Sequence, residues 1–361
     1  MTRETLTARQ VFWLGVLTMF PTAALMLPGD LLRAGGRYAW WTPLVAALPA
    51  LGLMWLVGTL VRRRGPLLRQ PTGLLGRALA GLLWLALGAY VVLIVREFAQ
   101  VAAVTFIFED VPLPVLAAAG VIAAGLAAWA GLPVLARPAE IVVSLLLLAY
   151  VGLLVAMIPF SHFAWALPLL PRNFAFAGWQ PLGRTWVWLV EPALLSLAVD
   201  EVNPDQQSRM TRSLAGAVGL VAGLLALTTW MLVADFGPAR AGELVLPLYE
   251  AAREASFGLF IEHLEALFIP IVIIGGCGKL GVYYWLWARV GRRMAGGSSD
   301  LWLLIELPVG GVLAVVLFQN AVAVDAALYL VLARVALPAM LLAILGGFVA
   351  TRGRSARAAS P

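Results

Sequence analysis

"LTMFPTAALMLPG" (residues 17–29) lies within an apolar stretch that covers residues 11 to about 32. A stretch of this length crosses the roughly 30 Å hydrocarbon core of a bilayer. Pro21 stands near its middle, and Pro28 follows about two turns later. A proline removes one backbone donor, and lipid offers no substitute partners. We therefore expect the helix to break at Pro21, at a place that faces protein or a water-filled cavity.

The composition indicates a polytopic membrane protein. Of 361 residues, 62% are hydrophobic and 12% are charged, and the mean hydropathy is +0.93, whereas soluble proteins are about one quarter charged. The net charge of +6 comes from basic residues in short loops, so membrane topology explains it and we expect no nucleic-acid partner. The sequence shows no enzyme signature, and we expect no cofactor.

Apolar runs between charge and turn clusters predict ten transmembrane helices in a single membrane domain that covers residues 1–361. The predicted spans lie near 11–33, 39–61, 77–106, 113–133, 140–160, 184–202, 214–235, 256–288, 301–319 and 324–349. With a cytoplasmic N-terminus, sixteen basic residues fall in inside segments and six in outside segments. This bias predicts that both termini are cytoplasmic.

The sixth span is interrupted by a proline, as the first one is. The stretch "VWLVEPALLSLAVDE" places Glu191 and Pro192 inside an apolar run. The two interrupted spans are five apart and run in opposite directions, a pattern that predicts a five-plus-five inverted repeat with broken helices 1 and 6 around a midplane site. For Pro21 alone, a simple kink is the favoured alternative.

Ionisable residues within spans are the other candidates for function, because they are costly in lipid. Arg96 and Glu191 lie deep enough to need a partner, and a structural ion pair explains either one as well as a ligand does. Lys279, the only lysine, either serves as a buried charge in place of a sodium ion or, as we expect more, snorkels to the interface. Cys277 is the only cysteine, and the two histidines lie far from it, so no metal site is expected.

Several stretches together resemble a known family. "LTARQVFWLGVLTMFPTAALMLPGDL", "REFAQVAAVTFIFEDVPLPVL", "AGLPVLARPAEI" and "LPLYEAAREASFGLFIEHLEALF" follow one another in the order and spacing seen in spore germination receptor B subunits. These endospore germination permeases belong to the amino acid–polyamine–organocation superfamily. The resemblance implies a ten-span inverted repeat with spans 1 and 6 unwound around a small-molecule site. It also implies a spore inner-membrane location and A- and C-type receptor subunits as partners.

The resemblance also suggests site residues. Residues that match family positions are Pro21, Thr22, Ala23, Ala24, Leu25, Arg96, Glu191 and, in the eighth-span motif, Glu262 and Glu265. The family usually has Arg where this chain has His263, which suggests a charge network, with Glu265 and Lys279, that titrates near neutral pH.

We therefore predict a germinant-sensing subunit that binds a small polar molecule, most simply an amino acid, between spans 1, 3, 6 and 8. Pro192 belongs to this predicted site with Glu191, which would receive an ammonium group. Two alternatives stay open: a secondary amino-acid transporter coupled to protons through Glu191 or Lys279, and a scaffold that binds nothing.

Overall fold

The computed structural model describes residues 4–64, 74–105, 111–169, 179–255, 264–318, 324, 327 and 330–342. Within these ranges the protein is helical, and its single β-bridge joins Leu6 to Val202. The α-helices are α1 (Ala8–Gly35), α2 (Thr42–Arg64), α3 (Leu74–Thr105), α4 (Leu113–Ala130), α5 (Leu132–Met157), α6 (Trp179–Val190), α7 (Gln207–Phe236), α8 (Pro238–Glu243), α9 (Pro247–Glu254), α10 (Glu265–Ala295) and α11 (Ser299–Val316). Shorter 3-10 and π elements are η1 (Gly36–Trp41), η3 (Ile158–Phe160), η4 (Phe163–Ala166), η5 (Glu191–Glu201), η6 (Pro204–Gln206) and η7 (Leu332–Ala336).

Eight segments of the described chain are long and apolar enough to cross a membrane. The first, Ala8–Val61, contains both α1 and α2 around η1, and the others correspond to the third to ninth predicted spans. The tenth predicted span, near 324–349, is described only in part. The protein is therefore a multi-pass helical membrane protein, while the ten-span count and the inverted repeat stay predictions.

The predicted break in the first span is wrong. The helix α1 is α-helical from Ala8 to Gly35, with Pro21 and Pro28 in its interior. A proline removes only one intrahelical hydrogen bond, and its ring is tolerated where a neighbour leaves room. Gly275 of α10 leaves this room, because a Cβ atom there would lie only 2.9 Å from Cγ of Pro21.

The sixth span does change its geometry at the predicted place. The helix α6 ends at Val190, and the 3-10 segment η5 begins at Glu191 with Pro192 in its first turn. Ala198 bends the segment, with φ −95° and ψ 15°. Runs of 3-10 helix beyond three or four residues are uncommon and often mark a hinge or a functional site, and η5 covers 11 residues in two parts on either side of Ala198.

Other boundaries differ from the predicted ones at charged turns. The fifth helix begins at Leu132 rather than near residue 140, since α5 continues through the stretch around Pro138. Gly131, with φ +90°, makes the tight connection from α4. The helix α10 begins at Glu265, and residues 256–263 of the eighth predicted span lie outside the described residues.

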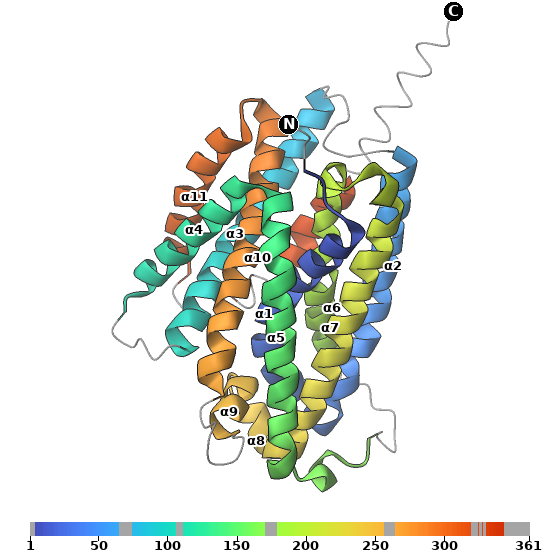
Figure 1. Ribbon diagram of the computed structural model, residues 1–361, viewed down its shortest axis with the longest axis vertical. Helices are drawn as coiled ribbons and strands as arrows, with labels where there is room; N and C mark the ends of the chain where they lie inside the picture. Colours follow the sequence, from blue (N-terminus) through green and yellow to red (C-terminus); the bar gives the residue numbers. More distant parts are fainter. Residues whose placement is uncertain are drawn as a thin grey trace, which may run out of the picture.

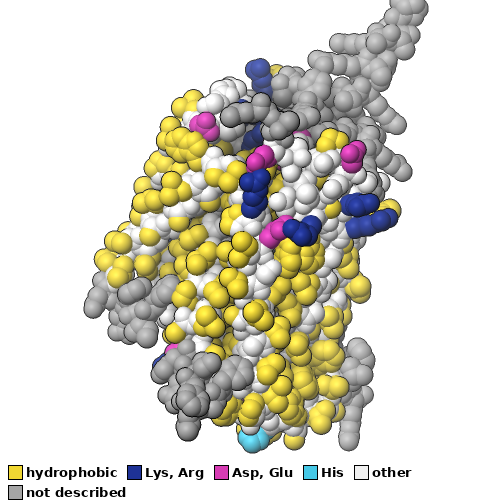
Figure 2. Space-filling model, in the orientation of Figure 1, with side chains coloured by type: hydrophobic (Ala, Val, Ile, Leu, Met, Phe, Trp, Pro, Cys, Tyr) yellow, Lys and Arg dark blue, Asp and Glu magenta, His cyan; other side chains and the backbone are white. Residues whose placement is uncertain are grey.

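The helix α1 lies at the centre of the bundle and packs against α7, α5 and α10 (Figure 1). Every residue from Leu14 to Leu25 is buried, as expected of a helix that is apolar all round. The face in Figure 2 shows hydrophobic side chains over most of its surface, and its charged side chains gather mainly in the upper half, toward the end where α1 begins. A broad apolar surface of this kind suits contact with lipid.

Candidate functional site

A buried ion pair joins the sixth and eighth spans. Nζ of Lys279, on α10, lies 3.0 Å from Oε1 and 3.2 Å from Oε2 of Glu191, the first residue of η5. Both side chains are 0% exposed. Glu191 takes its place here because the helix changes from α to 3-10 geometry at that residue. Removal of two charges from water is costly unless they are paired and hydrogen-bonded, so each residue depends on the other.

The first span supplies a hydrogen bond to the same ammonium group. Nζ of Lys279 donates to Oγ1 of Thr22 at 2.9 Å. The ring of Trp188, on α6, lies 4.9 Å from Nζ and adds a cation–π contact. The ammonium group is therefore surrounded by a carboxylate, a hydroxyl group and an aromatic face. The prediction that Lys279 snorkels to the interface is wrong, because these partners hold it inside.

Two tyrosines complete the surroundings of Glu191. Tyr90 of α3 and Tyr283 of α10 pack edge to face with their ring centres 5.2 Å apart, and both side chains lie beside Glu191. The hydroxyl group of Tyr283 also donates to the backbone carbonyl of Glu191 at 3.5 Å. The third span therefore reaches the site through Tyr90. We call Thr22, Tyr90, Trp188, Glu191, Lys279 and Tyr283 the central cluster.

The other predicted residues of span 1 lie beside the cluster. Pro21 packs against Gly275, and Ala23, Ala24 and Leu25 are fully buried in the apolar core. Since α1 is a continuous helix, this segment does not present the free backbone N–H groups that a broken helix would offer. Thr22 is the residue of the predicted segment that contacts the charged pair.

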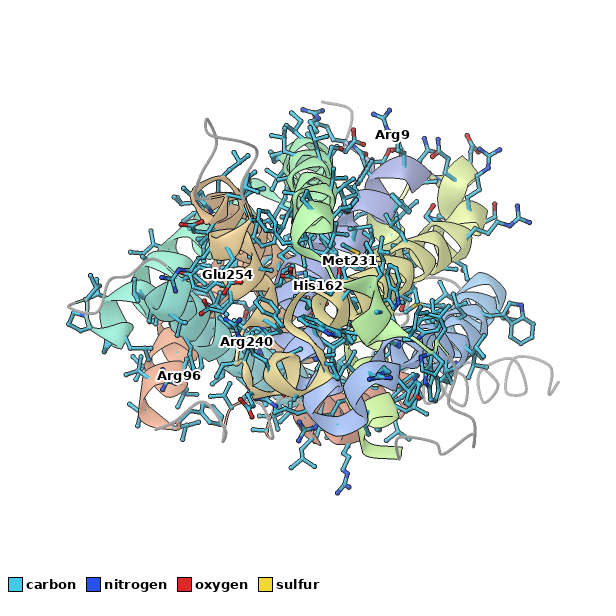
Figure 3. The ribbon with its side chains drawn as sticks, turned by 90° about the horizontal axis from the view of Figure 1, so that it is seen from below. Arg9, Arg96, His162, Met231, Arg240 and Glu254 are labelled. Carbon is cyan, nitrogen blue, oxygen red and sulfur yellow. The ribbon has the colours of Figure 1, made fainter. Side chains whose placement is uncertain are left out.

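The remaining predicted residues are not brought together. Arg96, labelled in Figure 3, is buried on α3, and its Nε and Nη1 atoms have no hydrogen-bond partner among the described residues. The cation beside Glu191 is Lys279 instead. Pro192 follows Glu191 and is buried. Glu265 lies fourteen residues before Lys279 on α10, about 21 Å along the helix axis, and His263 lies outside the described residues.

A second group of charged residues lies at the end of the molecule where α1 begins, and it connects three segments of the chain. Nη2 of Arg289, on α10, lies 2.9 Å from Oδ2 of Asp200 and 2.5 Å from Oε1 of Glu201, at the end of η5. The amide of Leu6 donates to the carbonyl of Glu201 at 2.7 Å, and the amide of Asn203 donates to Leu6 at 2.9 Å. The start of the first span, the end of the sixth and the eighth span are thus fastened together.

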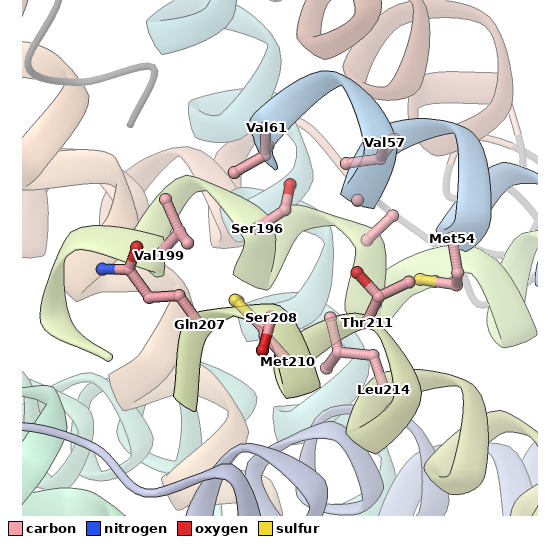
Figure 4. A pocket seen from close by; sticks show the side chains of 12 residues that line it. Met54, Val57, Val61, Ser196, Val199, Gln207, Ser208, Met210, Thr211 and Leu214 are labelled. Atoms are coloured by element: carbon pink, nitrogen blue, oxygen red, sulfur yellow. The ribbon is translucent and has the colours of Figure 1, made fainter. Parts of the chain in front are cut away.

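A cavity of about 370 Å³ lies on the other side of η5 (Figure 4). Residues of α2, η5 and α7 line it, with Ala193, Ser196 and Val199 spaced at three, as one face of a 3-10 helix requires. The cavity does not include Glu191 or Lys279.

The opposite end of the molecule, seen from below in Figure 3, is covered by η4, α8 and α9, where Arg240 pairs with Glu254 at 2.9 Å.

Sequence reasoning missed several residues of importance. Tyr90, Trp188 and Tyr283 look like ordinary apolar core in the sequence, and only their position beside Glu191 distinguishes them. Glu306, in "LLIELPVG", carries a signal that was available: a carboxylate in the middle of an apolar span. Among the described residues, no group of three or more His, Cys, Asp or Glu side chains could hold a metal ion.

Solved structures of similar fold are transporters. A mutant of the Eremococcus coleocola manganese transporter aligns with a TM-score of 0.57 and 11% identity, over 94% of this chain and 78% of that one. The same transporter in complex with an aromatic bis-isothiourea substituted compound aligns with a TM-score of 0.57 and 13% identity, over the same shares. At this identity the likeness concerns the fold alone. No curated protein sequence matches the chain.

The fold and the apolar surface define a multi-pass helical membrane protein, and it carries a buried charged cluster at its centre. The family described as "Spore germination protein" matches residues 5–322, nearly the whole chain. The protein belongs to this spore germination family.

Proposed function

We propose that the protein is the germinant-sensing subunit of a spore germination receptor and that it binds a small zwitterion, such as an amino acid, at the central cluster. The observation that carries the proposal is the ion pair between Lys279 and Glu191, which is fully buried where elements of spans 1, 3, 6 and 8 meet. Intramembrane charges of this kind are functional candidates by default.

The two opposite charges match a zwitterion. The ammonium group of an amino acid would contact Glu191, and its carboxylate would contact Lys279, so that the ligand inserts into the existing ion pair. In the unliganded protein the Lys279 ammonium group occupies the position that the ligand's ammonium group would take. Lys279 thereby takes the role that a broken first helix was expected to fill for the carboxylate, and Thr22 and Trp188 keep Lys279 in reach.

Ligand-dependent thermal stabilisation of the purified protein across amino acids, sugars and nucleosides tests the proposal. An amino acid should raise the melting temperature of the wild type. The double variant Glu191→Gln, Lys279→Gln removes both charges, and its affinity should fall by at least tenfold, about 1.4 kcal/mol. Glu140→Gln, at an exposed pair with Arg9, is the control and should bind like the wild type. A double variant that binds as tightly as the wild type would exclude the central cluster.

A secondary transporter is the second candidate, and the fold shared with transporters favours it. Here the same cluster would bind and release the solute, with proton exchange at Glu191 or Lys279. Uptake of a labelled amino acid into proteoliposomes distinguishes the two: a sensor gives stabilisation without uptake, and a transporter gives both.

The proposal includes an inner-membrane location in the spore, association with A- and C-type subunits, and cytoplasmic termini. Labelling of introduced cysteines, in a Cys277→Ala background, checks the orientation. A cysteine at Arg63 should be labelled from the cytoplasmic side only, and one at Glu243 from the outside only. Labelling of both positions from one side would contradict the predicted topology.

A further inference from the structure

Glu306 is another carboxyl group buried in the membrane-spanning part of the protein. It is the eighth residue of α11, a helix of 18 residues, so it lies about 10 Å from one helix end and about 15 Å from the other. Its relative exposure is 0%. The buried face of α11 contains Leu303, Glu306, Gly310 and Ala314, and this spacing turns Glu306 away from lipid and toward α3 and α10.

The side chains that surround Glu306 among the described residues are mainly aromatic. The indole N–H of Trp84, on α3, donates to Oε1 of Glu306 at 2.6 Å. Trp84 packs against Trp287 of α10 and Trp302 of α11, with ring centres 5.5 and 5.8 Å apart. The titratable group that faces Glu306 from α10 is Tyr284. No Lys or Arg among the described residues forms an ion pair with Glu306.

This arrangement differs from that of Glu191, where a lysine balances the carboxylate. An isolated carboxylate in an apolar interior is so costly that the group takes up a proton instead. In the neutral acid, Oε1 is the carbonyl oxygen that accepts from Trp84, and Oε2 carries the proton; Oε2 has no hydrogen-bond partner among the described residues. The hydroxyl group of Tyr284 and the indole N–H of Trp287 likewise have none.

Close packing holds the group in place. A Cβ atom at Gly291 would lie 3.0 Å from Oε1 of Glu306, and one at Gly310 would lie 2.4 Å from the hydroxyl oxygen of Tyr284. The two glycines let α10 and α11 approach around the carboxyl group. Tyr284 also follows directly after Tyr283, a member of the central cluster, so α10 contributes neighbouring residues to both sites.

We propose that Glu306 is a proton-binding site, separate from the central cluster, whose carboxyl group is neutral in the folded protein near pH 7. Binding places the proton on Oε2. The proton is released or bound when the packing of α3, α10 and α11 around Trp84 changes, because the ionised carboxylate is stable there only if its surroundings change.

Infrared difference spectroscopy of the purified full-length protein at pH 7 tests the proposal. The spectrum of the wild type minus that of Glu306→Gln should contain the carbonyl band of a protonated carboxylic acid. Asp300→Asn, at an exposed acid in the first turn of the same helix, is the matched control and should remove no such band. If Glu306→Gln leaves every protonated-acid band in place, Glu306 is ionised and the proposal is wrong.

A second variant keeps the test decisive if Glu306→Gln does not fold. Trp84→Phe removes the hydrogen bond to the carbonyl oxygen, so the assigned band should move to higher frequency, whereas the bands of other protonated acids should not move. A spectrum without any protonated-acid band that responds to Trp84→Phe would overturn the proposal.

Thermal unfolding adds an independent measurement: wild-type stability should fall relative to that of Glu306→Gln as pH rises above the usual glutamate range, since the unfolded state then releases the proton.

Discussion

Loss of the negative charge at Glu191 should destabilise the folded protein even without ligand. In Glu191→Gln the shape of the side chain is retained, but the Lys279 ammonium group loses the carboxylate that lies 3.0 Å away. At that separation and an effective dielectric constant near 20, the attraction is about 5–6 kcal/mol. Removal of one partner from a buried pair costs about 3–5 kcal/mol, since the other charge stays in the interior.

Reversible unfolding in mixed micelles measures this cost. Glu191→Gln should lose about 3–5 kcal/mol, whereas the double variant Glu191→Gln, Lys279→Gln should recover most of the loss because it leaves no unpaired charge. The matched control is Glu140→Gln, which breaks an exposed pair with Arg9 at 2.7 Å and should cost about 1 kcal/mol or less. A Glu191→Gln variant that is as stable as Glu140→Gln would refute the inference that Lys279 depends on this carboxylate for its charge.

Two smaller changes test other contacts of the first span. Thr22→Val keeps the volume but removes the oxygen that accepts from Lys279 at 2.9 Å, and unfolding in mixed micelles should show a loss of about 1.5–3 kcal/mol, the range for hydrogen bonds to charged groups. Gly275→Ala should cost about 1–3 kcal/mol in the same assay, because its Cβ atom would meet Pro21 at 2.9 Å. Gly219→Ala, on α7 with no atom within 4 Å of the new Cβ, is the control and should not destabilise.

Hydrophobic runs and charge clusters were enough to predict the class of the protein and most of its helices. Every span that faces lipid has an apolar sequence, so each helix of the described chain beyond about eighteen residues falls near a predicted one. Turns were harder to place. Pro138 and its charged neighbours suggested a loop, but a proline interrupts a helix by only one hydrogen bond, and α5 continues through it.

The same limit explains the two outcomes for the paired proline signals. Pro21 and Pro192 both lie in the interior of apolar runs, yet α1 continues and the sixth span changes to 3-10 geometry at Glu191. What differs is the neighbour: Gly275 leaves space for the Pro21 ring, whereas Glu191 is held by Lys279. Neither contact can be inferred from one sequence, since each joins residues that lie far apart in the chain. For the same reason the sequence did not determine the partner of Glu191. In the structure that partner is Lys279 and not Arg96.

The 3-10 geometry of η5 is what allows one segment to form both ion pairs with α10. Glu191 and Asp200 are nine residues apart, and the bend at Ala198 lies between them. On this bent segment both carboxylates face α10, where Lys279 and Arg289 bind them. In a straight α-helix nine residues make two and a half turns, so the two carboxylates would face opposite sides. A return of η5 to α-helix would therefore break at least one pair. Under the proposed function, a ligand that replaces Lys279 at Glu191 would remove one of these two ion pairs from the segment.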